Sequence, residues 1–192
     1  MSDHDMFAFM VDTDHVIVDP LTNNPLNRGF FVENSETGAS CVAVTAFFFD
    51  RVCGNHIIWG ATGVIEMRLR HIGDVHDRIW PQVEQVFRKH LASGEGETRR
   101  LLHEAQGTRY TDTLDNAAED LVALARRVKV PEIGIRRAEA VIEMAQKREN
   151  RYGDPRTVWS AVGCITEMSQ GAWADDRNKL DRAAGKLLSI VK

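Results

Sequence analysis

Short runs of apolar and β-branched residues, separated by polar turn residues, fill the first third of the chain and are typical of β-strands. In 64–70, Ile65, Met67 and Leu69 fall on one side of the chain and charged residues on the other. Asp12-Thr13-Asp14 predicts a turn between the first two strands. The predicted strands cover 7–11, 15–18, 29–33, 40–49, 56–59 and 64–70. We expect antiparallel hairpins, because the connections are too short for crossover helices.

From residue 71 onward the apolar residues recur at spacings of three and four, as in amphipathic helices. The first stripe consists of Val75, Ile79, Trp80, Val83, Val86, Phe87 and Leu91. Helix starts are predicted at Asp112 or Thr113, Arg136, Asp154 and Asp175. Strands followed by helices indicate an α+β fold. We expect an antiparallel sheet region over 1–73 and a helical region over 74–192, packed on the sheet as one integrated domain.

Charge is distributed unevenly along the 192 residues, whose net charge is −4. Up to Glu66 there are two basic and nine acidic residues, a net charge of −7, so the remainder carries +3. Such asymmetry indicates a polar partner, although solvated faces of amphipathic helices give the same pattern.

Residues 1–6 are polar and acidic, unlike a secretory signal, and no apolar run approaches the roughly 20 residues that span a bilayer. Cys41, Cys53 and Cys164 are odd in number and far apart, which predicts buried free thiols. We therefore expect a cytoplasmic protein without a membrane partner.

Sequence motifs for common cofactors are absent: there is no phosphate-binding loop, dinucleotide glycine motif or paired Cys-x-x-Cys. The segment with His71, Asp74, His76 and Asp77 carries residue types that bind divalent metals. A strand end followed by a capped helix start explains the same residues. We therefore predict neither a metal nor another cofactor.

A polar site is expected if strand pairing brings the turn at Asn34-Ser35 together with other polar positions of the first third. A carboxylate, a guanidinium and an imidazole in one place can support general acid–base chemistry. A structural alternative pairs the carboxylate with the guanidinium and leaves the turn bonded to its own backbone. The candidate catalytic residues are Glu36, Arg51, Asn55 and His71.

Arg68 and Arg70 fall on one strand face, with Arg51 expected on a neighbouring strand, and such a row can contact phosphates. The run Phe47-Phe48-Phe49 cannot face the core with all three rings, since strand residues alternate between faces.

The segments LNRGFFVENSETGASCVAV, FFFDRVCGNHIIWGA and RLRHIGD resemble the phage- and plasmid-like protein family classed as domain of unknown function 932. TVWSAVGCITEM and DDRNKLDRAAGKLL are similar to its C-terminal helical part, so the resemblance covers most of 26–188. Because family members are usually longer at the N-terminus, we expect this chain to correspond to the C-terminal portion or to a shortened form. The family occurs in phages, prophages and plasmids, often near replication and recombination genes.

These observations predict a DNA-metabolism accessory of a phage or mobile element that binds single-stranded DNA and anneals it as a homo-oligomer. Annealing needs a held backbone and no bond chemistry. The expected phosphate contacts are Arg28, Arg51, Arg68, Arg70 and Lys89. One alternative is an enzyme that uses the catalytic candidates above. Another is a module whose acidic first third binds a host or defence protein.

Overall fold

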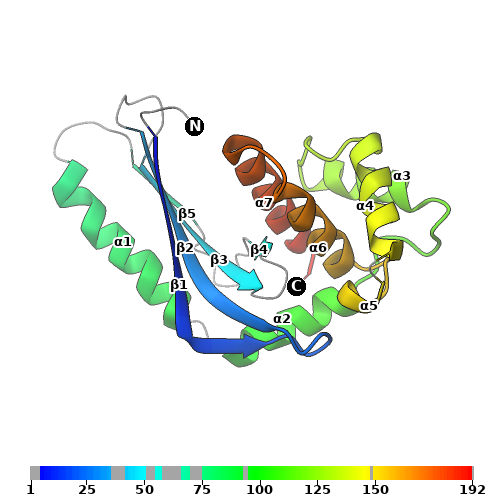
Figure 1. Cartoon of the computed structure of the whole chain (residues 1–192), viewed down its shortest axis with the longest axis horizontal. Coiled ribbons are helices and arrows are strands. Elements are labelled where there is room, and N and C mark those ends of the chain that lie inside the picture. The colour runs from blue at the N-terminus through cyan, green and yellow to red at the C-terminus, as the bar shows by residue number, and fades with distance from the viewer. Residues whose placement is uncertain are drawn as a thin grey trace.

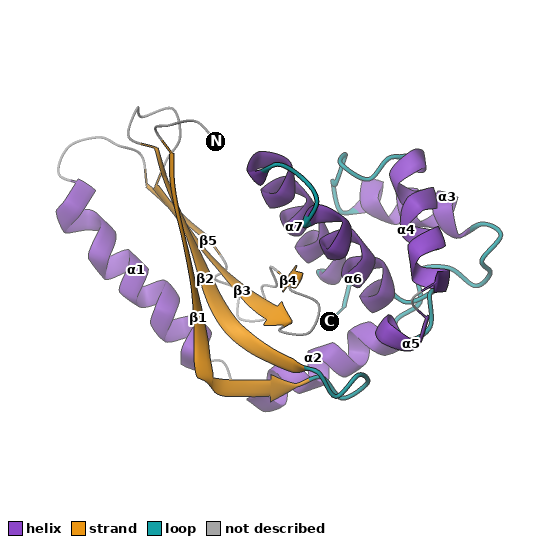
Figure 2. Cartoon of the chain, in the orientation of Figure 1, coloured by secondary structure: helices purple, strands orange, loops and turns teal. Residues whose placement is uncertain are grey.

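Strands precede helices in the structure, a computed structural model, which confirms the predicted α+β fold (Figure 2). It describes residues 5–35, 42–50, 55–57, 66–69, 75–92, 95–147 and 149–191. Within these ranges no helix is long and apolar enough to cross a membrane.

The sheet is antiparallel and has five strands within the described residues. β1 (Asp5–Val18) pairs with β2 (Pro25–Ser35), which pairs with β3 (Val42–Asp50). The short strands β4 (Asn55–Ile57) and β5 (Glu66–Leu69) both pair with β3, at opposite ends of it. β1 therefore forms one edge of the sheet, nearest the viewer in Figure 1.

The predicted turn at residues 12–14 is an irregularity inside one bent strand, because the β1–β2 register shifts between Val11 and Val16. The Asp12 carboxylate accepts a hydrogen bond of 2.9 Å from the backbone N–H of Asp14. The Asn27 side-chain amide donates to the Asp12 carbonyl oxygen over 2.6 Å. These side-chain bonds replace part of the strand ladder, so the chain bends without leaving the sheet (Figure 1).

The long helix α1 (Val75–Ala92) covers one face of the sheet (Figure 1). Phe30, Val44 and Ala46 of the sheet form a small core with Val86 of α1. Trp80 was predicted in this apolar stripe, but it is 70% exposed. The apolar stripe of α1 is therefore narrower than the sequence pattern suggests.

The remaining helices form a second and larger core. They are α2 (Glu95–Gly107), α3 (Ala117–Arg127), α4 (Ile135–Lys147), α5 (Glu149–Tyr152), α6 (Val158–Ser169) and α7 (Ala174–Leu188). α6 is buried along nearly its whole length. Ile17, Leu26 and Phe48 of the sheet belong to the same core, so one apolar interior joins the two regions.

Two helix starts differ from the sequence prediction. α3 begins at Ala117 with Asn116 before it, later than Asp112 or Thr113. α6 begins at Val158, and the Thr157 hydroxyl accepts a hydrogen bond from the backbone N–H of Ser160, so Thr157 is the N-cap and Asp154 is not. Asp154 is instead occupied by Arg156.

The phenylalanine run is divided between the two faces of the sheet. Phe47 stacks on Phe9 with ring centroids 5.0 Å apart, and Phe48 lies 5.2 Å from the ring of His90 in α1. Both rings are buried, while the side chain of Phe49 lies outside the described part. Cys164 is a buried free thiol as predicted, and Cys41 and Cys53 lie outside the described residues.

Candidate nucleic-acid interface

The residues predicted to bind DNA or to catalyse a reaction do not form one surface among the described residues. Glu36, Arg51, Arg70 and His71 lie outside the described residues. Asn55 is placed by its backbone in β4, opposite Asp50, and Arg68 in β5, opposite Ala43. Within the described part there is no group of three or more His, Cys, Asp or Glu residues that would hold a metal ion.

The two remaining predicted phosphate contacts do not share a surface. Arg28 is only 3% exposed and lies in β2, opposite Phe48. Lys89 is exposed in the last turn of α1. Arg28 therefore offers no surface for a phosphate chain in this structure, whereas Lys89 does.

A cluster of cations that the sequence analysis missed lies where α3 ends and α4 begins. We call it the basic turn, and its residues are Arg126, Arg127, Lys129, Arg136 and Arg137. All five are exposed, and the segment between them carries one carboxylate, Glu132. Arg137 donates a hydrogen bond to the Glu132 carbonyl oxygen. Across the described part of the chain, the other four cations form no ion pair.

Lys129 adopts a backbone conformation that a lysine rarely has. Its φ is 59°, in the left-handed region that glycine favours. The Val130 N–H donates to the Ala125 carbonyl oxygen over 2.8 Å, and the Lys129 N–H donates to that of Arg126 over 3.1 Å. This is the Schellman ending of a helix, in which glycine usually occupies the position of Lys129. The cationic side chain is thus present despite a backbone cost.

The helix dipoles favour positive charge at one half of the basic turn and oppose it at the other. Arg126 and Arg127 lie in the last turn of α3, where a positive charge is favourable. Arg136 and Arg137 lie in the first turn of α4, and that turn contains no acidic residue. Positive side chains at that end oppose the dipole. The dipole of α4 therefore does not explain these two arginines, and an anion placed there would meet favourable charge.

A surface pocket of about 330 Å³ opens beside the basic turn. Arg127 belongs to both the basic turn and the pocket lining. The other lining residues are Arg109, Tyr110, Asp120, Ala123, Leu124 and Ile190. The pocket thus combines an aromatic ring and aliphatic surface with two guanidinium groups and one carboxylate.

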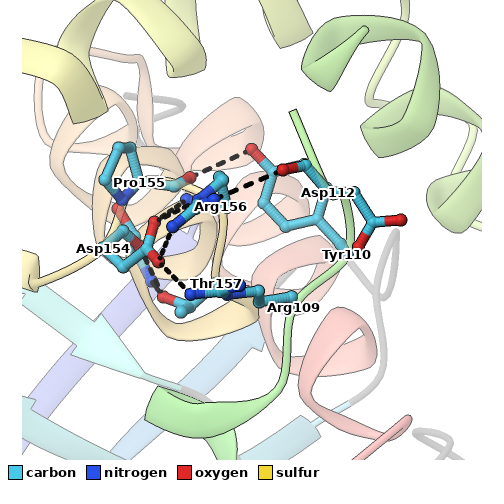
Figure 3. Close-up of polar contacts among 8 residues, drawn as sticks. Arg109, Tyr110, Asp112, Asp154, Pro155, Arg156 and Thr157 are labelled. Atoms are coloured by element: carbon cyan, nitrogen blue, oxygen red, sulfur yellow. Dashed lines mark hydrogen bonds and ion pairs between the residues drawn. The ribbon is translucent and has the colours of Figure 1, made fainter. Parts of the chain in front are cut away.

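The pocket wall is held by contacts between two loops (Figure 3). Arg156 donates to both carboxylate oxygens of Asp154, over 2.9 and 2.8 Å. Arg109 reaches the same carboxylate over 3.1 Å. The Tyr110 N–H donates to the Arg156 carbonyl oxygen, and its hydroxyl donates to that of Pro155. This network fixes Arg109 and Tyr110 from both backbone and side chain.

Protonation states in this region are set firmly. Hydrogen bonding from Arg156 lowers the pKa of Asp154 to about 2, so this carboxylate is charged at neutral pH. Burial raises the pKa of Tyr110 well above its usual range, so its phenol stays protonated. Asp120 accepts a hydrogen bond of 2.7 Å from the Thr111 hydroxyl. Neither Asp154 nor Tyr110 therefore exchanges a proton near neutral pH.

One sequence signal could have pointed to this region: RRVKVPEIGIRR, residues 126–137, has five cations and one acid. The loops at 108–112 and 154–157 lie far apart in sequence, and no motif predicts that they meet. Comparison with protein-family models, curated proteins and solved structures gave no match. The resemblance to the phage and plasmid family thus stays a prediction.

Proposed function

We propose that the protein binds single-stranded nucleic acid, with the phosphate backbone on the basic turn and one base in the adjoining pocket. The observation that carries this proposal is the set Arg126, Arg127, Lys129 and Arg136, exposed and without ion pairs in the described structure. Phosphates are anionic groups spaced along a chain, and clustered cations provide most of the affinity for them.

The pocket supports single-stranded over double-stranded nucleic acid. Proteins that bind single strands combine a basic track with aromatic surfaces for unstacked bases. Tyr110 offers such a surface beside Arg127. In a duplex the bases are stacked and paired, so a base would have to leave the helix to enter the pocket.

The predicted role in DNA metabolism of a phage or mobile element rests on the sequence resemblance, and a strand-binding surface is compatible with it. An annealing activity would require a homo-oligomer that holds backbone and leaves base edges exposed. No observation in the described part favours the enzyme alternative.

A salt titration of oligonucleotide binding tests the proposal. The variant replaces Arg126, Arg127, Lys129 and Arg136 by Gln, and binding is followed by fluorescence anisotropy. For single strands each lost phosphate contact reduces the slope of log K against log salt by about 0.7, so four contacts reduce it by about 3. When the salt concentration rises fourfold, the wild type should therefore lose roughly 50-fold more affinity than the variant.

The matched control removes four surface cations that already have acidic partners: Arg88, Arg100, Lys147 and Lys179. Both variants change the net charge equally, so a difference between them reports the position of the charge. If both variants lose the same affinity for the oligonucleotide, the effect comes from net charge alone and the basic turn has no special role. Absence of binding by the wild type at low salt would rule the proposal out.

A further inference from the structure

The outer edge of β1 is the longest backbone surface in the sheet without a neighbouring strand in the described structure. β1 has 14 residues and pairs with β2 on one side only. Figure 1 shows no described element in front of it. An edge of this kind presents backbone N–H and C=O groups that another strand can pair with.

Regular pairing of β1 with β2 runs from Asp5 to Val11 and stops at the irregularity that begins at Asp12. The straight part of the edge therefore has Ala8 at its centre. Beyond it, the bend and the carboxylates of Asp12 and Asp14 work against further pairing. One seven-residue segment is thus suited to accept a strand.

The sequence of this segment is symmetric about the same residue. Met6-Phe7-Ala8-Phe9-Met10 reads identically in both directions. When two identical strands pair antiparallel about a two-fold axis at Ala8, Phe9 lies opposite Phe7 of the second copy. Met10 likewise lies opposite Met6 of the second copy. Aromatic residues therefore meet aromatic residues, which is a favourable cross-strand pairing.

The side chains described on this segment are apolar and partly open to solvent. Phe9 is 44% exposed and Met10 is 42% exposed. Such exposure on an edge strand is a liability unless the edge is covered. The sequence palindrome coincides with the centre of the regular edge, which favours a second copy of the chain as the covering strand.

We propose that two copies associate through β1, antiparallel and two-fold symmetric about Ala8, to form one continuous sheet. Closed two-fold contacts use the same patch on both subunits, as this palindrome does. A single pair of edge strands buries less area than a standard interface. We therefore expect a reversible dimer with a dissociation constant on the order of micromolar. This inference does not depend on nucleic-acid binding.

A charge-swap experiment at Ala8 tests both the interface and its register. Ala8→Lys and Ala8→Glu each bring like charges together on the two-fold axis, so each variant alone should dimerise at least about tenfold more weakly. An equimolar mixture brings opposite charges together and should restore the dimer. Sedimentation velocity distinguishes a monomer of 21.6 kDa from a species of twice that mass. Circular dichroism verifies that both variants fold.

The matched control places the same two charges on Gln146, an exposed residue of α4, where neither the single variants nor their mixture should alter association. A wild type that stays monomeric over about a hundredfold concentration range overturns the proposal. The proposal is also overturned if the single variants dimerise as strongly as the wild type, or if the equimolar mixture does not restore the dimer.

Should the charged variants fail to fold, Ala8→Cys gives a second test. Directly opposed strand residues have Cα atoms about 4.5 to 5.5 Å apart, within disulfide range. Mild oxidation should link Ala8→Cys chains into dimers and leave Thr13→Cys chains, changed beyond the irregularity, unlinked. Equal linking of both variants would contradict pairing about Ala8.

Discussion

The imidazole Nε2 of His90 donates a hydrogen bond of 3.1 Å to the carbonyl oxygen of Phe47, between α1 and the sheet. A carbonyl oxygen only accepts, so Nε2 carries the proton and the ring tautomer is fixed. The ring is 2% exposed and lies 5.2 Å from those of both Phe30 and Phe48. His90 therefore links α1 to the sheet by a hydrogen bond that lies inside their apolar interface.

This environment predicts acid sensitivity. Burial lowers the pKa of His90 from 6.5 to about 4, helped by the charge of Arg28 and opposed by the bond to Phe47. Between these values the unfolded chain binds more protons than the folded one, so stability falls as the pH falls from about 6.5 to about 4. We expect a loss of about 3 kcal/mol, measured by urea unfolding at several pH values. His90→Gln should flatten this dependence, and an unchanged slope would contradict the assignment.

Asp154 should stabilise the loops around the pocket. Its side chain is 28% exposed and bound by Arg156 and Arg109. Asp154→Asn should lower the free energy of unfolding by about 1 to 2 kcal/mol after allowance for solvent screening. The folded pKa of about 2 is below the usual 3.8, so this contribution holds above pH 3.8 and is lost as the pH falls through 2.

The control for Asp154 is Glu143→Gln, which breaks an exposed pair with Lys147 in α4. It should change stability far less, because exposed helix pairs contribute little. If both substitutions cost the same, the Asp154 network has no special role in stability. Chemical denaturation of the two variants beside the wild type decides this.

Lys129→Gly should separate stability from binding. Glycine adopts the observed φ of 59° without a Cβ penalty, so we expect a gain of about 0.5 to 1 kcal/mol. The same change removes a cation from the basic turn, so oligonucleotide affinity should fall. Lys129→Ala loses the charge and keeps the backbone cost, so it should bind as weakly without the gain. A glycine variant that binds like the wild type would exclude Lys129 from the interface.

Gly29→Ala should destabilise the sheet. A Cβ on Gly29 would overlap the ring of Phe47, which stacks on Phe9 of β1. Overpacking of this kind typically costs about 1 to 3 kcal/mol. Gly96→Ala in α2 is the control, since no atom lies within 4 Å of its added Cβ and helix propensity favours alanine. Thermal unfolding of both variants should shift in opposite directions.

The sequence predicted the order of elements well, because short apolar runs between turn residues and apolar stripes with a period of 3.6 reflect which residues are buried. The predicted boundaries of elements were wrong where a polar side chain forms hydrogen bonds with residues close to it in sequence. Asp12 bonds the Asp14 N–H and so bends a continuous strand at a position that resembles a turn. Asp154 and Pro155 have the pattern of a helix start, yet Arg156 engages the aspartate and Thr157 becomes the cap.

The candidate site was harder to predict than the fold. Arg28 looked available because arginine is usually exposed, but its strand position directs it to the face under α1, where it is buried. The basic turn was readable as a run of cations, although the absence of acidic partners for four of them among the described residues depends on the tertiary arrangement. The pocket depends on Arg109 meeting Asp154, a contact between residues 45 apart that no local pattern encodes.

Ile17, Leu26 and Phe48 share one core with α3, α4, α6 and α7. A fragment that ended before α1 would expose these three side chains to water, and a fragment that began there would lack part of its own interior. Cutting the chain between the two regions should therefore leave two pieces that remain associated. Neither piece is suited to be transplanted alone into a fusion protein.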